Sequence, residues 1–443
     1  MHSHGTSAWG WLLHKEWREL TTSRSFWVML ALIGPLVGIS FANGVSAYAE
    51  ASGNTGSAGG LSDALFPLDG VVAPSFSAYE IAATFLLPFV AIRAIAGDRA
   101  SGALKLELQQ GLSPFAMISA KALVLGAGWC VAALPLLLAA ILWLSYGGSL
   151  YPPEILSLTL GHILHAALII AMAAAAAALA EHPSTAAILV LAFTVGTWVL
   201  SFIAAAQGGI FEQIASFTPS EMLDDFRVGL IRLNLILAGL ILTATGLTIA
   251  AIWTRMGITP KRRAIESVAV VAIAVCALFG ASFLRPSWDV SENERNSLPL
   301  EERELLSGIS APVRITAYLA PEDPRRFELE RQMLSKLRRT MPNLTVEYIS
   351  QSTTGLFEQA RANYGQIHYE LGGKSAVGQS VTQEGVLDAI YELAGIQPAK
   401  EGEVGHKGHP LAVQPIGAAP LFYVLWPLAV LAFGYFLQRR RFA

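Results

Sequence analysis

The chain has little charge and almost no cysteine. Asp, Glu, Lys and Arg make up 14% of its 443 residues, whereas soluble domains carry about 25%. With 53% hydrophobic residues, an ordinary soluble domain is excluded, and a net charge of −3 gives no support for a nucleic-acid partner. The two cysteines, Cys130 and Cys276, both fall inside apolar runs, which favours small buried side chains over a disulfide or a metal site.

Lysine and arginine are absent from three polar segments, 43–78, 147–154 and 207–226. The polar segments that alternate with them each carry several basic residues. These are Lys15, Arg18 and Arg24; Arg93, Arg99, Lys105 and Lys121; Arg255, Lys261, Arg262 and Arg263; and Arg439, Arg440 and Arg441. Basic segments stay on the cytoplasmic side during insertion. The alternation therefore predicts a multi-pass protein of the cytoplasmic (inner) membrane with both termini in the cytoplasm.

The apolar runs are long enough to cross a bilayer, which takes about 20 residues for about 30 Å of hydrocarbon. The expected spans are 26–44, 79–97, 117–146, 155–180, 185–206, 229–253, 265–284 and 417–437. The fold class is therefore mostly α, a membrane helix bundle of about eight transmembrane helices. The third run contains Pro135 and is expected to be tilted or kinked. The first run follows no signal-peptide pattern and is expected to remain as an anchor.

Residues 1–25 form a different kind of segment, which includes AWGWLLHKEWREL. Apolar side chains can share one face of a helix, with charged side chains largely opposite. The apolar set is Trp9, Leu12, Leu13, Trp17 and Leu20, and the charged set is Lys15, Glu16, Arg18 and Glu19. This pattern is typical of an amphipathic helix that lies in the membrane interface on the cytoplasmic side. The alternative is a lead-in helix that only anchors the chain.

Residues 286–416 have a much higher charge density than the rest of the chain. The expected strands are 312–320, 344–350 and 366–373, and the expected helices are 325–340 and 382–395. This order implies a small α/β domain with at least one parallel strand pair. Because seven spans precede it, the domain is expected outside the cytoplasm, inserted before the last helix. Residues 417–443 then supply the eighth span and a basic cytoplasmic tail.

The sequence predicts no catalytic residue and no metal or cofactor bound by this chain. The segment GGKS, 372–375, fails as a phosphate loop because His368 occupies the position of the required earlier glycine. The histidine pairs 162/165 and 406/409 lack nearby carboxylates or thiols, so hydrogen bonding and linker composition explain them better than a metal does.

Four ionisable residues near the ends of spans are candidates for a substrate pathway or gate, because charge in hydrocarbon is costly. They are Glu80, Arg93, Arg227 and Arg232, the last two beside Asp224 and Asp225. The alternative is that each side chain reaches out to the polar interface.

The segment DRASGALKLELQQGLSPFAMISAK, 98–121, resembles the cytoplasmic loop of type-2 ABC exporter (ABC-2) permeases, and HKEWREL followed by SRSFW resembles their interfacial helix. The resemblance implies a six-span permease domain, 26–256, whose loop 98–121 docks on a separate ATPase that binds ATP and Mg²⁺. The implied lever is 102–111. The implied docking residues are Asp98, Gly102, Leu104, Lys105, Leu106, Glu107, Leu108, Gly111 and Pro114, and those of the interfacial helix are Lys15, Glu16, Trp17 and Arg18.

The second half is similar to the auxiliary exterior domain of gliding-type ABC systems. The similar segments are SLPLEERELLSGISAPVRITAYLAPEDP and YGQIHYELGGKSAVGQSVTQEGVLDAIYELAG. That module is flanked by a span on each side, which corresponds to 257–285 and 417–443 here. The resemblance implies a fusion of permease and auxiliary domain, with an extracytoplasmic partner protein.

The resulting functional hypothesis is a permease subunit in the lipid bilayer that exports an unidentified substrate, works with an ABC ATPase, and forms a homodimer or pairs with another permease. A second hypothesis is an ATPase-driven protein that passes motion or a signal to an exterior partner. A third is a maturation factor for an extracytoplasmic metalloenzyme, in which the histidine-bearing linker would matter.

Overall fold

The structure is a computed structural model that describes residues 8–53, 65–109, 111–207, 210–215, 217–320, 323–349, 363–397 and 408–439. The chain forms two compact units. The first contains the chain up to Val199, the stretch Ser216–Trp288 and everything from His406 onward. The second contains Leu200–Ala215 and Asp289–Gly405.

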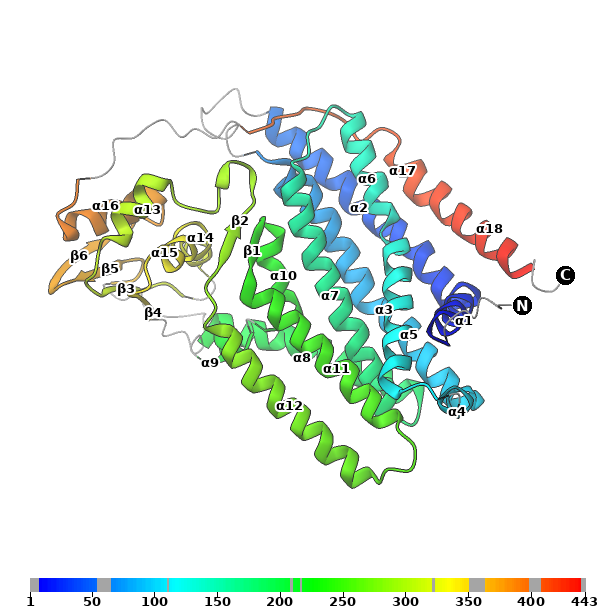
Figure 1. The fold of residues 1–443 in the computed structure, drawn as a ribbon. Helices are drawn as coiled ribbons and strands as arrows, with labels where there is room; N and C mark the ends of the chain where they lie inside the picture. Colours follow the sequence, from blue (N-terminus) through cyan, green and yellow to red (C-terminus); the bar gives the residue numbers. More distant parts are fainter. Residues whose placement is uncertain are drawn as a thin grey trace, which may run out of the picture. The chain divides into compact units, whose positions relative to one another are not determined.

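Long helices dominate the first unit (Figure 1). Its elements are α1 (Ala8–Thr22), α2 (Arg24–Gly53), the π-helical turn η3 (Leu68–Val72), α3 (Ala73–Ser101), α4 (Ala103–Gln109), α5 (Pro114–Ala132), α6 (Leu134–Ser145), α7 (Pro152–Leu179), α8 (Pro183–Gln207, which continues past the unit), α10 (Pro219–Arg227), β1 (Leu230–Arg232), α11 (Leu233–Thr254), α12 (Pro260–Ser282), β2 (Ser287–Asp289), α17 (Ala418–Pro420), η6 (Leu421–Leu425) and α18 (Trp426–Arg439). The short helix α9 (Ile210–Ala215) belongs to the second unit.

Eight helical segments among the described residues are long and apolar enough to cross a membrane. They are Arg24–Gly53, Leu68–Arg99, Pro114–Ser145, Pro152–Leu179, Pro183–Ala204, Leu233–Thr254, Pro260–Ser282 and Ala418–Leu437. The expected eight-span helical bundle is therefore confirmed. Its first two helices are longer than the expected spans 26–44 and 79–97. The sixth span begins at Leu233 and not at 229, because residues 230–232 form β1 and pair with β2.

Helix α7 packs against α3, α5, α10 and α11. Its end, AMAAAAAALA (171–180), has little side-chain bulk, and its alanines are buried. A neighbouring helix can therefore approach its backbone closely. On α11, a Cβ added at Gly246 would lie 3.0 Å from the carbonyl oxygen of Ala171, so glycine is needed at this approach.

The third span is broken at its middle, as Pro135 predicts. Helix α5 ends at Ala132 and α6 begins at Leu134, with the proline in its first turn. The proline has no N–H to continue the helical ladder. The buried Tyr79 of α3 donates a hydrogen bond of 2.9 Å to the carbonyl of Trp129, and so ties α3 to the helix just before the break.

The second unit contains a four-stranded sheet in the order β4-β3-β5-β6. The strands are β3 (Val313–Ala317), β4 (Leu344–Tyr348), β5 (Ile367–Leu371) and β6 (Lys374–Gly378), and the helical elements are η4 (Glu292–Glu294), α13 (Leu300–Ser307), the continuous run α14 (Pro324–Leu329), η5 (Glu330–Leu334) and α15 (Ser335–Thr340), and α16 (Gln383–Ala394). Strands β3 and β4 are parallel, which confirms the expected parallel pair. Alternate residues of β3 and β5 are buried, so the core lies on one face of the sheet.

The two glycines of GGKS form the turn of a hairpin, since β5 and β6 are antiparallel and are joined by Gly372 and Gly373, and Lys374 and Ser375 begin β6. Both glycines have positive φ, 56° and 85°, as a two-residue hairpin turn requires. A phosphate loop joins a strand to a helix, so this geometry agrees with its rejection. Strand β6 itself is not among the strands expected from the sequence.

The contact between α2 and η3 gives a stability prediction. A Cβ added at Gly44 would lie 2.9 Å from the backbone oxygen of Gly70, whereas one added at Gly126 would meet nothing within 4 Å. Gly44→Ala should therefore destabilise the protein by about 1–3 kcal/mol, and Gly126→Ala should leave it unchanged or stabilise it by up to about 1 kcal/mol. Thermal unfolding in one detergent measures both, and equal midpoints for the two variants would contradict this packing.

Candidate functional site

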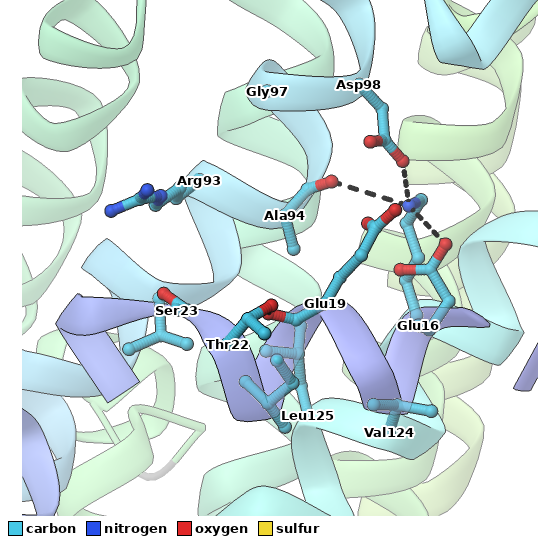
Figure 2. A pocket seen from close by; sticks show the side chains of 13 residues that line it. Glu16, Glu19, Thr22, Ser23, Arg93, Ala94, Gly97, Asp98, Val124 and Leu125 are labelled. Carbon is cyan, nitrogen blue, oxygen red and sulfur yellow. Dashed lines mark hydrogen bonds and ion pairs between the residues drawn. The ribbon is translucent and has the colours of Figure 1, made fainter. Parts of the chain in front are cut away.

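A lysine ammonium group is buried where α1, α3 and α5 meet. Lys121 is the eighth residue of α5, and 1% of its side chain is exposed. Its Nζ donates to Glu16 Oε1 of α1 at 2.7 Å, to Asp98 Oδ2 of α3, and to the Ala94 carbonyl at 3.4 Å. Figure 2 shows the carboxylates of Glu16 and Asp98 and the Ala94 carbonyl converging on one point. The two carboxylates offset the free-energy cost of removing the lysine ammonium group from water.

A second lysine extends these ion pairs to α4. Lys15 Nζ contacts Glu107, Asp98 Oδ2 at 3.3 Å and Glu16 Oε1 at 3.1 Å. We call Lys15, Glu16, Asp98, Glu107 and Lys121 the charge cluster. The side chains of Glu16 and Glu107 are 3% and 4% exposed, so these carboxylates depend on the lysines for compensation.

Local backbone conformation places α4 beside the charge cluster. Gly102 ends α3 in the left-handed region, with φ of 79°, and the chain continues directly into the seven residues of α4. Gly111, with φ of 80°, follows, and the side chain of Ser113 then accepts a hydrogen bond from the Ala116 N–H at the start of α5. These residue types are the usual helix stop and start signals. Pro114 occupies the first turn of α5.

Helix α4 has two different faces. Leu104 and Glu107 are buried, and Leu108 is half-buried. Lys105, Leu106 and Gln109 are exposed, as the i, i+1, i+4 spacing of one helix face requires. The apolar Leu106 is 64% exposed. One face of α4 is thus packed against the rest of the protein, and the other face is exposed.

Nearby carboxylates raise the pKa of the Lys15 ammonium group. Burial lowers the pKa of Lys15, but its hydrogen bond with Glu107 and the charges of Glu16 and Asp98 outweigh burial, and the net pKa lies above the usual 10.5. While its carboxylate partners are ionised, the raised pKa of Lys15 contributes stability that is fully present below the usual 10.5 and is lost as pH rises through the folded-state pKa. Burial and the nearby Asp98 raise the pKa of Glu19.

Three carboxylates near the cluster could in principle hold a cation. The oxygens of Glu16, Glu19 and Asp98 lie within 4.8 Å of one another. However, the ammonium groups of Lys15 and Lys121 contact this same set, Lys15 at 3.2 Å from Glu19. Lysine nitrogen therefore supplies the positive charge that a metal would otherwise bring.

A cavity of about 250 Å³ opens beside the cluster. Its polar lining includes Glu16, Glu19, Arg93, Asp98 and Lys121 (Figure 2). Arg93 is exposed and donates to Ser25 Oγ at 3.1 Å. This sequence-predicted gate residue therefore lies on the rim of the cluster and makes no contact with the other three gate candidates in the described chain.

The other three gate candidates form ion pairs toward the opposite end of α3. Glu80 is buried and contacts Arg227, which also contacts Asp224 at 2.7 Å. Arg232 contacts Asp225 at 2.9 Å. The Glu80 carboxylate is buried on Arg227, so its side chain does not extend into solvent.

The structure corrects two expectations about helix faces. Glu16 was expected opposite the apolar face of the N-terminal helix, but it lies between Leu12 and Leu20 on the buried stripe of α1, because Lys121 requires a counter-charge there. Trp17, expected on the apolar face, is 37% exposed, and Arg18 is exposed. In α4, Glu107 was expected as a polar contact for a partner, but it is buried on Lys15.

Two residues of this region were missed as site residues. Lys121 lies inside the expected third span, 117–146, and a lysine in an apolar run is itself a signal for a buried partner. Arg99 donates to the carbonyls of Ala178 at 2.7 Å and Ala180 at 2.8 Å, and so caps the end of α7. A cation at a helix C-terminus is favourable, but no local pattern identifies which helix it caps.

The two histidines of the pair 162/165 contact different partners, and only one histidine of the pair 406/409 lies within the described residues. His165 contacts Thr84 Oγ1 at 2.9 Å, and His162 contacts the Leu158 carbonyl at 2.8 Å, in agreement with hydrogen bonding rather than a shared metal. His409 lies within the described chain, where its N–H donates to the Leu65 carbonyl at 2.8 Å and its carbonyl accepts from Tyr48 at 2.7 Å. His406 lies outside the described residues.

A family model described as ABC-2 family transporter protein matches residues 10–256. This range includes most of α1, all of α4 and every residue of the charge cluster. No curated protein and no solved structure matches the chain.

The charge cluster gives a prediction for Lys121. Lys121→Met should destabilise the protein by about 3–5 kcal/mol, because it leaves Glu16 buried without its closest cation. Adding Glu16→Gln should recover at least half of the loss, because Asp98 retains Lys15. Lys105→Met, which removes an exposed lysine of α4, is the matched control and should change little. Thermal unfolding checks all three, and a loss below about 1 kcal/mol for Lys121→Met would refute the cluster.

The pair at the other end of α3 should respond asymmetrically. Arg227→Met leaves the Glu80 carboxylate buried without its cation and should cost about 3 kcal/mol. Glu80→Gln leaves Arg227 with Asp224 and should cost about 1 kcal/mol. Denaturation of the two variants under one condition measures the difference, and equal losses would contradict the assignment of Asp224 as the second partner.

Proposed function

Since the chain belongs to the ABC-2 transporter family, we propose that it is the permease subunit of an exporter driven by a separate ABC ATPase. The family match covers the helices that build the charge cluster and α4. ATP and Mg²⁺ are bound by the ATPase in this proposal, and the substrate is unidentified. The observation that carries the proposal is the pair of faces on α4.

The ATPase is proposed to dock on the exposed face of α4, formed by Lys105, Leu106 and Gln109. An exposed leucine between polar side chains is typical of a small docking surface with an apolar centre and a polar rim. Leu104 was expected to contact the ATPase, but it is buried against the permease itself. We therefore assign Leu104 to anchoring and Leu106 to docking. Asp98, Gly102, Gly111 and Pro114 set the position of α4 in this proposal.

The charge cluster is proposed to pass the motion of α4 to the spans. An isolated seven-residue helix is not stable in water, so α4 needs its contacts with the body of the protein. Glu107 ties it to Lys15 of α1, and Lys15 shares Asp98 with Lys121 of α5. A force on α4 therefore reaches three other helices through ion pairs. Buried ion pairs favour discrete packings over gradual bending, as in rigid-body switching.

The topology completes the proposal. With eight spans, both termini and α4 lie on the cytoplasmic side of the inner membrane, and residues 286–416 lie outside it. The absence of lysine and arginine from 43–78, 147–154 and 207–226 supports this orientation. We propose that 286–416 is a gliding-type auxiliary domain that binds an extracytoplasmic partner, and that the permease works as a homodimer or with a second permease.

The docking face can be tested with two leucines of similar exposure. Leu106 is 64% exposed, and Leu300 of the second unit is 67% exposed. Leu106→Asp should abolish co-purification of an ABC ATPase from solubilised membranes, because it places a carboxylate at the centre of the docking face. Leu300→Asp should leave co-purification unchanged. Mass spectrometry of the purified material identifies and quantifies the ATPase.

Thermal unfolding of the same samples separates docking from folding. Both variants should unfold at the temperature of the unmodified protein, because both leucines are exposed. Unchanged co-purification with Leu106→Asp would exclude α4 as the docking helix. Loss of the ATPase with both variants would show that the effect is not specific to α4.

A further inference from the structure

The cavity of about 250 Å³ beside the charge cluster is lined by residues of α1, α3 and α5. Its lining includes Asp98 and Lys121, which are buried, and Glu19, Arg93 and Gly97, which are exposed. The cavity therefore runs from the surface of the protein inward to the charge cluster. It is larger than a cavity of about 150 Å³ that admits benzene, so it has room for a small polar group.

The lining of α3 changes in character along the helix. Val90, Arg93, Ala94, Gly97 and Asp98 all line the cavity, and their spacing places them on one helix face. Toward the end of the span, an apolar side chain is followed by a cation and then by an anion. Arg93 and Asp98 are five residues apart, which corresponds to about 7.5 Å along the helix.

Helix α5 repeats the apolar part of this order. It begins at Pro114, beside the end of α3, and runs back into the membrane-spanning segment. Lys121 meets Asp98, and Val124 and Leu125 line the cavity one turn further along α5. The end of the cavity that lies deeper along the spans is therefore apolar on both helices.

Arg93 supplies a cation without a matching carboxylate. Its guanidinium donates to Ser25 Oγ at 3.1 Å and forms no ion pair within the described residues. Arg93 lies inside the apolar segment Leu68–Arg99, yet its side chain is exposed. An arginine at such a position extends toward the polar interface, where lipid phosphates lie, and its planar group can donate two parallel hydrogen bonds to a phosphate.

The inner end of the cavity has an excess of carboxyl groups over ammonium groups. Four carboxyl groups share two lysines there: Glu16, Glu19, Asp98 and Glu107 contact Lys15 and Lys121. The side chain of Glu19 is 48% exposed, and its ion pair within the described chain is with Lys15 alone, at 3.2 Å. A further ammonium group that enters through the cavity can thus reach Glu19 without displacing a lysine.

These features define the chemistry of a ligand. It carries a phosphate for Arg93 and, further toward the end of the span, an ammonium group for Glu19. A primary ammonium has three N–H donors, whereas a trimethylammonium has none. An apolar part is required beside Val90, Val124 and Leu125. A phospholipid with an aminoethyl headgroup has these three parts in this order, from hydrocarbon to water.

We propose that this cavity binds the headgroup of an aminophospholipid from the surrounding bilayer. The phosphodiester accepts hydrogen bonds from Arg93, the primary ammonium donates to Glu19, and the glycerol end of the lipid contacts Val90 and Val124. The acyl chains remain in the bilayer, because the cavity holds only the headgroup. This site goes beyond the proposed permease function and does not require an ATPase.

The test compares three lipids that have the same acyl chains. Delipidated full-length protein is titrated in detergent with phosphatidylethanolamine, phosphatidylcholine or phosphatidylglycerol, and native mass spectrometry gives the Kd of the first bound lipid. We expect phosphatidylethanolamine to bind about three- to tenfold more tightly than either of the others, as one charge-assisted hydrogen bond at a partly exposed site allows. The soluble headgroup glycerophosphoethanolamine, added at the concentration of the lipid, should not displace it.

Variants assign the two charges of the headgroup to two side chains. Glu19→Met should abolish the preference for phosphatidylethanolamine over phosphatidylcholine and leave the binding of phosphatidylcholine unchanged. Arg93→Met should weaken all three lipids by about three- to tenfold and retain the preference. Arg262→Met removes a 72% exposed arginine of α12 that does not line the cavity, and should change neither quantity.

Gly97 provides a test of the space itself. A Cβ added at Gly97 would meet nothing within 4 Å, so a leucine can be placed there without a clash at its Cβ. Gly97→Leu extends a side chain into the cavity and should weaken all three lipids. Thermal unfolding shows whether each variant is folded.

Equal affinity for phosphatidylethanolamine and phosphatidylcholine in the unmodified protein would overturn the proposal. A preference that survives in folded Glu19→Met would overturn it as well, and displacement of the lipid by the soluble headgroup would assign the site to a soluble molecule instead. If Glu19→Met does not fold, the three lipids on the unmodified protein and on Arg93→Met decide the outcome. Loss of ATPase co-purification is a separate measurement, so failure here leaves the permease proposal untouched.

Discussion

The ammonium group of Lys121 is the constraint on which the region around α1, α3, α4 and α5 depends. A lysine inside an apolar helix is tolerated only when carboxylates approach it, and breaking such a buried pair costs about 3–5 kcal/mol. Glu16 and Asp98 provide these carboxylates from helices that are distant in the sequence. The rotation of α1 about its axis follows from this requirement, because Glu16 must point inward between Leu12 and Leu20. The exposed position of Trp17 is a consequence of the same rotation.

The same constraint explains how a very short helix can serve as a rigid contact. Helix α4 has seven residues and therefore little stability of its own. Its inward face is held by Leu104 and by the pair between Glu107 and Lys15. The outward face then needs no further support, and its side chains are free to match a partner. Separation of the anchoring residues and the proposed docking residues onto two faces also separates the effects of their substitution.

Local sequence patterns predicted the helices and most of the strands, but not the ion pairs between residues of different helices. Length and hydropathy were sufficient for the eight spans, and strand–helix–strand order was sufficient for the parallel pair β3–β4. Periodicity alone placed Glu16 on the wrong face, because its partner Lys121 is 105 positions away. Charges at both ends of spans indicated that Glu80 and Arg227 matter, but not that they contact each other. Strand β6 was missed because the strand 366–373 was expected to lead into a turn at GGKS, with no second strand after that turn.

Helix α3 links the two ionic regions. Asp98 belongs to the charge cluster. Glu80, which pairs with Arg227, lies about 27 Å from Asp98 along the helix. Between them, Pro88 removes the N–H that would bond the Thr84 carbonyl, so the helix has one weakened point. The side chain of Thr84 is itself held by His165 of α7. Because both ends are fixed by buried ion pairs, a displacement that starts at α4 either moves α3 as a unit or bends it near Pro88. Movement of α3 as a unit would shift Tyr79 relative to the break in the third span, whereas bending near Pro88 would leave Tyr79 in place.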